Sequence, residues 1–580
     1  MNLHELVSQS LLDTQGSLYA FRPELVLCVT IVAMLVIRMS PLRQFVSSFA
    51  VVLVGALIAL SQTGPWLDVP RTELFTGMLV FDGFTVFVKT VLLLFLVLFV
   101  LFTRISGLPD REDAADIFTL VIGATLGMCV MASANHLLTV FLGVEMASVP
   151  SYALAAMLKG RRVSSEAALK YAVYGAGSAG VMLYGISLLG GTANSLHLPT
   201  IAIELAERLP SMTGDQITIL ALAGLMIGVG LAFKLSAFPF HFWCPDVFEG
   251  AAAEIGAFLS IASKAGALAL LVRVALGVST IAPGAGLPGA GLPATTAAAE
   301  ATENTMTMTF AVNAGGEVTG AELKAADKPL DRDTAMQNLA PVRSFIGKLV
   351  ALLAALSCTF GNLAAYGQTN IKRLFAYSTI AHAGYMMMGV AALMVTVGID
   401  RLEASRAIAG ISIYIFIYLF MNLGAFAIIA FWRNSLRTEE IADYAGLLRV
   451  FPGTVICFAA ILFSLIGLPP LAGFIGKLTV FAPLANGYKL SAAAGQPAFF
   501  LLVLLVIGSV NTAISLFYYL RLIKVMTIDP EPKDRRPADM SQVMVRGLYV
   551  GLITLPLLTL IFSWNWLYEW TMSAASKLLG

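Results

Sequence analysis

Runs of about 20 apolar residues recur along almost the whole sequence, and a helix needs that length to cross the hydrocarbon core of a bilayer. Of the 580 residues, 58% are hydrophobic and only 12% are charged, which is more apolar surface than a soluble protein of this length can hide. Only helices and closed barrels satisfy their backbone polar groups inside lipid. The sequence therefore predicts an all-α integral membrane protein that crosses the bilayer many times.

Fourteen segments are apolar enough to be predicted as transmembrane helices. Several of them are longer than a straight crossing requires, so tilted or broken helices are expected. The predicted segments are 24–39, 44–62, 76–103, 115–133, 136–158, 167–190, 215–240, 252–278, 345–366, 373–396, 407–432, 453–484, 498–522 and 545–570.

Lysine and arginine gather in alternate loops, including 159–162, 433–449 and 521–536. Basic loops stay in the cytoplasm, so this pattern predicts that both termini lie on the outer side of the membrane. The loop 241–251 breaks the pattern because it is acidic, which predicts that it is held against the protein rather than freely solvated. Residues 280–342 are rich in Gly, Ala, Pro and Thr and are predicted to form a flexible outer insertion without a catalytic role.

Charged or titratable groups inside predicted helices are candidates for function, because each of them must be paired or face water. Each also has a structural explanation: Glu145 and Lys234 could form an ion pair between two helices, Lys170 could pair with Glu166 four residues earlier, and a buried histidine could be neutral and bonded to a carbonyl. The candidates are Glu145, Lys170, Lys234, Lys264, His382 and Lys477.

Desolvation favours the neutral form of a lysine, and a nearby carboxylate favours its charged form. A buried lysine beside a movable glutamate is therefore switched between the two forms when one distance changes. A series of such lysines joined by water would pass protons by electrostatic repulsion. The residue types alone thus favour the hypothesis of a proton relay.

Prolines interrupt two of the predicted helices next to these lysines. Pro239 follows Lys234, and Pro469 and Pro470 precede Lys477. Proline breaks a helix, and unwound backbone at membrane depth is tolerated where it lines a watery cavity. Because the two breaks lie five helices apart, they predict two inverted repeats. We divide the chain into helices 1–3 (1–114), a first repeat of helices 4–8 (115–278), the insertion (279–343), a second repeat of helices 9–13 (344–523), and a C-terminal loop with helix 14 (524–580).

The sequence contains no pattern for a metal, a nucleotide or a nucleic acid. Its five cysteines and five histidines are scattered without the spacing of metal ligands, and the net charge is only +1. Glycine-rich nucleotide motifs are absent from the sequence as well. We therefore expect no cofactor in this chain.

Several motifs nevertheless identify a family. FLGVEMASVPSYAL, EAALKYAVYGAG, GLAFKLSAFPFHFWCPDVFEGA, FLSIASKAGALALLVR, NIKRLFAYSTIAHAGYMMMGV and SLIGLPPLAGFIGKLTVF resemble the antiporter-like membrane subunits of respiratory complex I, and most closely the N subunits of bacterial NADH–quinone oxidoreductase. The resemblance covers residues 20–570 apart from 280–342. It implies a membrane-arm subunit of fourteen helices, in contact with neighbouring antiporter-like subunits and lipid.

The resemblance also implies roles for the candidate residues. Protons would be moved by quinone reduction in other subunits, which would hold the NADH, FMN, iron–sulfur and quinone sites, so the enzyme activity belongs to the complex. Two related assemblies remain open as alternatives: a sodium/proton antiporter and a membrane-bound proton-pumping hydrogenase. The implied relay consists of Glu145 paired with Lys234, Lys264 on the central route, Lys477 toward the outer face, Lys170 and His382.

Overall fold

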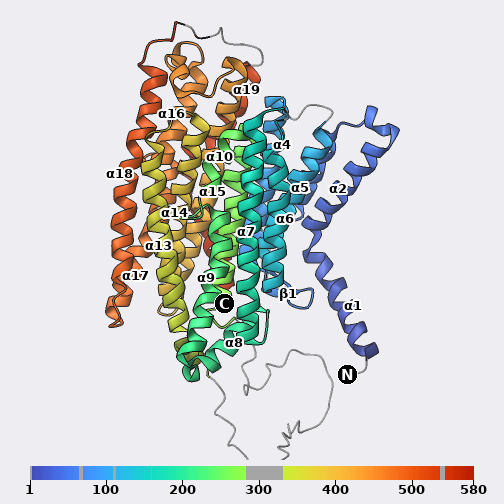
Figure 1. Ribbon diagram of the computed structural model, residues 1–580, viewed down its shortest axis with the longest axis vertical. Coiled ribbons are helices and arrows are strands. Elements are labelled where there is room, and N and C mark those ends of the chain that lie inside the picture. Colours follow the sequence, from blue (N-terminus) through green and yellow to red (C-terminus); the bar gives the residue numbers. More distant parts are fainter. Residues whose placement is uncertain are drawn as a thin grey trace, which may run out of the picture.

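The computed structural model describes residues 3–64, 70–108, 113–158, 160–282, 331–533, 535 and 543–579. Figure 1 shows long helices that run side by side along one axis of the molecule. The helices are α1 (Leu3–Ala20), α2 (Arg22–Met39), α3 (Ser48–Ser61), α4 (Gly83–Ser106), α5 (Ala114–Ser133), α6 (Leu137–Ala155), α7 (Arg162–Ala193), α8 (Leu198–Arg208), α9 (Gly214–Leu235), α10 (Trp243–Gly250), α11 (Ala253–Gly277), α12 (Arg332–Asn338), α13 (Ala340–Ala365), α14 (Ile371–Thr396), α15 (Arg401–Leu436), α16 (Pro452–Ile466), α17 (Ala472–Ala493), α18 (Phe499–Thr527), α19 (Val543–Thr559) and α20 (Asn565–Leu579).

The described part of the chain has ten helices that are long and apolar enough to cross a membrane. The helical segment Leu11–Ala20 meets α2 at 85°, and the two count as an eleventh crossing if they form one bent span. Three shorter apolar helices, α3, α16 and α19, lie beside them. This composition and arrangement confirm an all-α membrane protein.

Some predicted boundaries were wrong. Residues 76–82 do not begin a transmembrane helix, because β1 (Thr72–Leu74) and β2 (Leu79–Phe81) pair there as an antiparallel hairpin and α4 begins at Gly83. Residues 331–342 do not belong to an insertion, because they form α12 and the start of α13. The rest of the predicted insertion, 283–330, and two residues of the basic loops, Lys159 and Arg536, lie outside the described residues.

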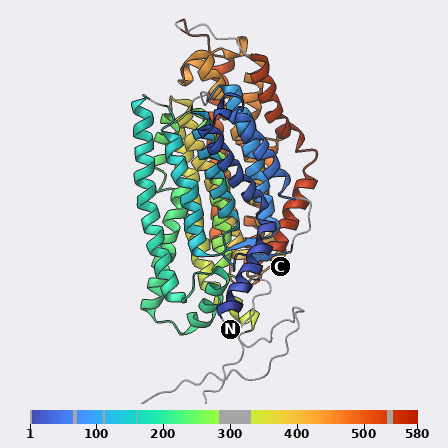
Figure 2. The ribbon, with the colours of Figure 1, turned by 90° about the vertical axis from the view of Figure 1, so that its right-hand side faces the viewer.

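Both chain termini lie toward the same end of the bundle in two perpendicular views (Figures 1 and 2). We call this the terminal end; it also holds the hairpin and α8. The start of α4 packs there against α20, since a Cβ on Gly83 would lie 3.0 Å from the Cα of Ala574. The last two helices, α19 and α20, extend to residue 579, whereas the last transmembrane helix was predicted to end at residue 570.

Three helices form the centre of the bundle. The apolar stretches of α11 and α15 are completely buried, and that of α14 is 94% buried. Small residues let neighbouring helices approach these central ones closely. A Cβ on Gly384 of α14 would lie 2.7 Å from the backbone nitrogen of Cys358 in α13, so a larger side chain has no room.

Both predicted helix breaks are present. The first lies between the end of α9 at Leu235 and the start of α10 at Trp243, and its first residue, Ser236, has a φ of 55°. The second lies between the end of α16 at Ile466 and the start of α17 at Ala472. Gly467 ends α16 with a φ of 88°, a conformation that glycine adopts without a Cβ clash. The peptide bonds Phe238–Pro239 and Pro469–Pro470 within the breaks are both cis.

Candidate functional site

Four of the titratable residues predicted from the sequence lie either halfway along a helix or next to a helix break. Lys264 is the twelfth residue of α11, which has 25 residues, and His382 is the twelfth of the 26 in α14. Lys234 and Lys477 stand next to the two breaks. All four side chains are buried, with at most 5% of their surface exposed. Only Lys170 and Glu145 differ from this description.

Lys234 contacts a serine rather than the predicted glutamate. Its Nζ donates a hydrogen bond to Ser148 Oγ over 3.0 Å. Ser148 lies on α6, three residues after Glu145, and Glu145 is itself partly exposed. No described ion pair within 4.0 Å joins Glu145 to Lys234. Their charges therefore interact only over a longer distance. The direct Glu145–Lys234 ion pair implied by the family resemblance is therefore not formed in this structure, and Ser148 is the hydrogen-bond partner of Lys234 instead.

Lys264 is bound to the first break. Its Nζ donates to the carbonyl oxygen of Lys234 over 3.2 Å and to Ser236 Oγ. The ammonium group also lies 5.2 Å from the centroid of the Trp243 ring, a distance at which a cation is attracted to the ring face. The last carbonyl groups of a helix have no partner within it and carry partial negative charge, so a cation is favoured there. The broken helix thus holds the Lys264 ammonium group with neutral oxygens.

Lys477 has the same relation to the second break. Its Nζ donates to the carbonyl oxygen of Ile466, the last residue of α16, over 2.8 Å. A weaker contact joins it to Thr512 Oγ1 at 3.5 Å, and it lies 4.7 Å from the centroid of the Tyr385 ring. Both breaks therefore present a free carbonyl group to a buried lysine.

His382 lies within a cluster of four buried tyrosines. Its Nδ1 is 2.7 Å from the hydroxyl of Tyr414, and its Nε2 is 3.3 Å from the hydroxyl of Tyr519. The rings of Tyr385 and Tyr418 lie within 6 Å of the histidine ring, at centroid distances of 5.7 and 5.3 Å. Each hydroxyl can both donate and accept a hydrogen bond, so this tyrosine cluster can pass a proton.

Further hydroxyl groups extend the tyrosine cluster toward Lys264. Ser260, one helical turn before Lys264 on α11, is 2.9 Å from Thr379 Oγ1 and 3.2 Å from the hydroxyl of Tyr418. Ser378 is 2.6 Å from the hydroxyl of Tyr519. The sequence analysis missed all these groups. A buried hydroxyl requires a partner, so the tyrosines in the apolar run ISIYIFIYLF were the available signal.

Lys170 lies apart from the central residues, toward the end of the bundle opposite the terminal end. Its side chain is 38% exposed and forms ion pairs of 2.8 Å with both Glu166 and Asp246. Arg373 joins the same group through Asp246 and Glu249. The prediction that the acidic loop is held within the protein is confirmed, because basic residues of α7 and α14 bind it.

Asp246 is the common member of this group of ion pairs. Burial acts to raise the pKa of its carboxyl group. Hydrogen bonds and positive charge from Lys170 and Arg373 outweigh burial and hold the pKa below its usual range. The carboxylate therefore remains charged and joins the two halves of the chain.

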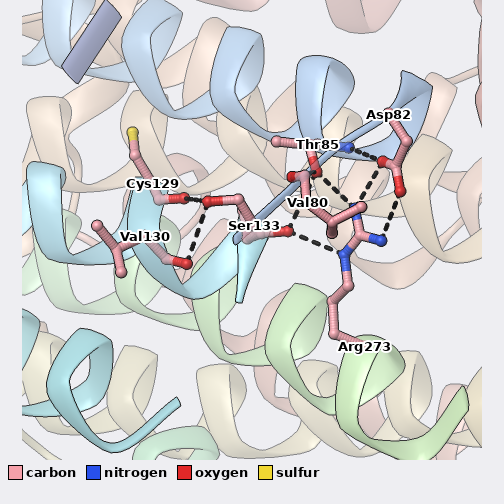
Figure 3. A network of polar contacts seen from close by, with 8 residues as sticks. Val80, Asp82, Thr85, Cys129, Val130, Ser133 and Arg273 are labelled. Atoms are coloured by element: carbon pink, nitrogen blue, oxygen red, sulfur yellow. Dashed lines mark hydrogen bonds and ion pairs between the residues drawn. The ribbon is translucent and has the colours of Figure 1, made fainter. Parts of the chain in front are cut away.

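The structure also contains buried ion pairs that the sequence analysis did not identify. Arg273 of α11 donates two hydrogen bonds of 2.6 Å to the carboxylate of Asp82 and a third, of 2.5 Å, to Thr85 (Figure 3). An arginine inside an apolar run was a usable signal for this pair. Four ion pairs have at least one fully buried member; with their N–O distances they are Glu24–Lys89 (2.6 Å), Asp82–Arg273 (2.6 Å), Glu254–Arg433 (3.2 Å) and Glu439–Lys372 (2.9 Å).

Within the described residues, no group of three or more His, Cys, Asp or Glu side chains is placed to hold a metal ion. What the centre of the bundle offers is a row of ammonium, imidazole and hydroxyl groups, all of which exchange protons. This chemistry suits proton transfer between buried sites.

Comparison with known proteins supplies the family. The family model for the NADH:quinone oxidoreductase/Mrp antiporter transmembrane region matches residues 134–283 and 334–515. The NADH-quinone oxidoreductase subunit N of Anaeromyxobacter sp. (strain Fw109-5) is 32% identical over 567 residues, with 97% of each chain covered. Subunit N 2 of Sorangium cellulosum (strain So ce56) is 33% identical over 585 residues, with 98% of this chain and 99% of the relative covered.

Two solved structures are also similar to this chain. A chain of respiratory complex I from Thermus thermophilus with bound aureothin superimposes with a TM-score of 0.66 and 28% identity, covering 94% of this chain and 98% of that one. A chain of the Mrp complex from Dietzia sp. DQ12-45-1b has a TM-score of 0.68 at 16% identity, with 98% of each chain covered, which shows a shared fold alone. The chain belongs to the family of NADH-quinone oxidoreductase N subunits, the antiporter-like subunits of the membrane arm of respiratory complex I.

Proposed function

We propose that this chain carries protons across the membrane through the buried lysines of its centre, driven by quinone reduction in other subunits of the complex. The observation that carries this proposal is that Lys234, Lys264 and Lys477 are buried and bonded to neutral oxygen atoms. A buried ammonium group without a carboxylate partner is easily deprotonated, because burial disfavours its charged form. Each lysine can therefore hold a proton and then release it.

The proposed route runs from Lys234 to Lys264, and then through the tyrosine cluster to Lys477. Lys234 and Lys264 already share the end of α9, so a proton gained by one repels a proton on the other. Ser260, Thr379 and Tyr418 connect the Lys264 side with the surroundings of His382. The remaining step leads from His382 to Lys477. The Tyr385 ring lies beside both residues and connects them.

We assign Glu145 the role of controlling Lys234. A carboxylate that approaches a lysine favours its charged form, and one that withdraws favours release of the proton. Glu145 is partly exposed and Ser148 holds Lys234 in its place, which leaves room for the carboxylate to move. Lys170, with its group of ion pairs, is assigned to the cytoplasmic approach to this route.

We further propose the membrane topology predicted from the sequence. The ten long helices, the bent segment with α2, and the three shorter apolar helices together give fourteen crossings, with α16 and α17 counted as one broken crossing. The paired breaks support two inverted repeats, 115–278 and 344–523, between the N-terminal helices (1–114) and the C-terminal region (524–580). In this topology the terminal end faces the periplasm and the chain lies in the inner membrane.

Partner subunits complete the activity in this proposal. The relatives are subunits of an NADH-quinone oxidoreductase, so NADH, FMN, iron–sulfur clusters and quinone are assigned to other chains of that complex, and neighbouring antiporter-like subunits and lipid to the flanks of this one. If this chain copurifies with such redox subunits, the alternatives of a sodium/proton antiporter and a proton-pumping hydrogenase are excluded.

The experiment replaces Lys234 or Lys477 by alanine in the assembled complex. We expect normal assembly with quinone reduction and proton uptake both lowered at least about tenfold, which corresponds to about 1.4 kcal/mol of barrier. Lys348→Ala is the control, because Lys348 is an exposed lysine of α13. Normal quinone reduction and proton uptake in an assembled Lys234→Ala or Lys477→Ala complex would show that the relay assignment is wrong.

A further inference from the structure

A small cavity at the terminal end lies apart from the proposed relay and is surrounded by arginines. Its volume is about 50 Å³, and its lining includes the C-terminal turns of α11, the start of α12 and the end of α20. A single water needs roughly 10–15 Å³ on this measure, so the cavity has room for a group of several heavy atoms. The four arginines that line it are Arg71, Arg273, Arg332 and Arg401.

Two of the four arginines, Arg71 and Arg332, lack an acidic partner among the described residues. Arg273 is bound to Asp82 (Figure 3), but no described contact within 4.0 Å pairs Arg71 or Arg332 with an acid. Arg332 makes one long hydrogen bond, from Nη2 to the carbonyl oxygen of Ile281 at 3.4 Å, and its buried Nε has no partner among the described residues. No acidic side chain lines the cavity.

The nearest acidic groups have other partners or are exposed to solvent. Glu73 accepts hydrogen bonds from Asn135 and contacts His197, and Asp333 is exposed on α12. Burial lowers the pKa of Arg71, and repulsion from Arg273 lowers it further. Burial and repulsion from Arg401 act in the same direction on the pKa of Arg332. Asp82 and Glu73 oppose this effect at Arg71, and Asp333 opposes it at Arg332, but both pKa values remain lowered, so an anion in the cavity would stabilise both guanidinium groups.

We propose that this cavity binds a phosphate group through the guanidinium groups of Arg71 and Arg332, with Arg273 and Arg401 adding positive charge around it. Guanidinium groups recognise phosphate and carboxylate oxygens in pairs. These four come from four separate parts of the chain, namely the segment before β1, α11, α12 and α15. Donors on several sides suit a tetrahedral dianion better than a planar carboxylate. The phosphate belongs either to a phospholipid headgroup, since the site lies at the ends of the membrane helices, or to free inorganic phosphate.

The first test uses the wild-type complex and needs no substitution. Delipidated complex is treated with phenylglyoxal, which modifies arginine, with and without inorganic phosphate, and modified peptides are measured by mass spectrometry. We expect phosphate to slow modification of Arg71 and Arg332 at least about fivefold. Arg208 is the internal control, because it lies at the same end, is 46% exposed and pairs with Glu204. Equal modification rates at Arg71 and Arg332 with and without phosphate, with or without added phospholipid, overturn the proposal.

The second test distinguishes the two sources. Native mass spectrometry counts the phospholipids retained by complexes carrying Arg332→Gln or the control Arg208→Gln, and dialysis with radioactive inorganic phosphate measures binding after delipidation. Loss of one phospholipid in Arg332→Gln alone identifies a headgroup. A phosphate affinity at least about tenfold weaker in Arg332→Gln, with unchanged lipid, identifies free phosphate. Identical lipid counts and phosphate affinities in the two variants contradict the proposal.

Discussion

Two sets of buried charges in this protein differ in their partners. In the first set, each pair has a member at or near a helix end, and each cation contacts a carboxylate; we call these the peripheral pairs, namely Glu24–Lys89, Asp82–Arg273, Glu254–Arg433 and Glu439–Lys372. In the central set, defined as Lys234, Lys264 and Lys477, the described contacts are with serine and threonine hydroxyls, carbonyl oxygens and aromatic rings. The difference teaches that burial of a charge alone does not indicate its role.

A paired charge and an unpaired one behave differently when the partner or the charge is removed. Breaking a buried pair leaves an uncompensated charge and is strongly destabilising, whereas replacing a poorly compensated charge by an apolar group of similar size removes a desolvation penalty. The peripheral pairs should therefore support the fold, and the central lysines should support transport at some expense of stability. The following predictions test this difference.

The largest effect is expected from breaking a peripheral pair. Arg273→Ala leaves the buried Asp82 carboxylate without its counter-charge, which costs about 3–5 kcal/mol. We expect little assembled complex in membranes, measured by the amount of subunit that comigrates with the complex on a native gel. Arg208→Ala, which breaks an exposed pair, should assemble normally. Equal assembly of the two variants would contradict the assigned role of the peripheral pairs.

Replacing a central lysine is expected to impair proton pumping without reducing stability. Lys264→Met keeps the length of the side chain and removes the charge, so thermal stability should be unchanged or higher. Proton pumping should fall at least about tenfold, a change of about 1.4 kcal/mol in barrier. Both quantities are measured on the same purified complex. A loss of stability with retained pumping would place Lys264 with the peripheral pairs.

A smaller effect is expected within the tyrosine cluster. Tyr414→Phe removes the hydroxyl 2.7 Å from His382 Nδ1, which should lower the free energy of unfolding by about 1 kcal/mol and slow proton pumping severalfold. Tyr444→Phe is the matched control, because the buried hydroxyl of Tyr444 has no hydrogen-bond partner among the described residues. If the two variants pump equally fast, the tyrosine cluster does not carry the proton.

The smallest effect is expected where charges are paired but partly exposed. Asp246→Asn should lower stability by less than about 1 kcal/mol near pH 7, because solvent screens such pairs. The pKa of Asp246 is held below its usual range, so its contribution is present above about pH 4 and is lost as the pH falls further. Thermal unfolding at several pH values measures it. Asp215→Asn, at an exposed position of α9, is the control.

The sequence located Lys234, Lys264, His382 and Lys477 because a titratable residue inside an apolar run is a local signal. The two helix breaks were equally local, since proline acts on its own helix. The residues that these groups contact could not be predicted from such local signals. Lys234 and Ser148 are 86 residues apart, and Asp82 and Arg273 are 191 apart, so no spacing within one helix relates them. The hydroxyls of the tyrosine cluster were missed because tyrosine is an ordinary residue of an apolar helix.

By itself, the sequence determined the membrane class, the breaks, the candidate lysines and the family, because hydrophobicity, proline and motif spacing act along a single segment. The tertiary structure alone decided that Ser148 rather than Glu145 holds Lys234, which buried charges have carboxylate partners, and where four arginines surround one cavity. The physical reason is that the free energy of a buried charge depends on the groups within a few ångströms of it. Those groups come from helices whose mutual positions are set by packing.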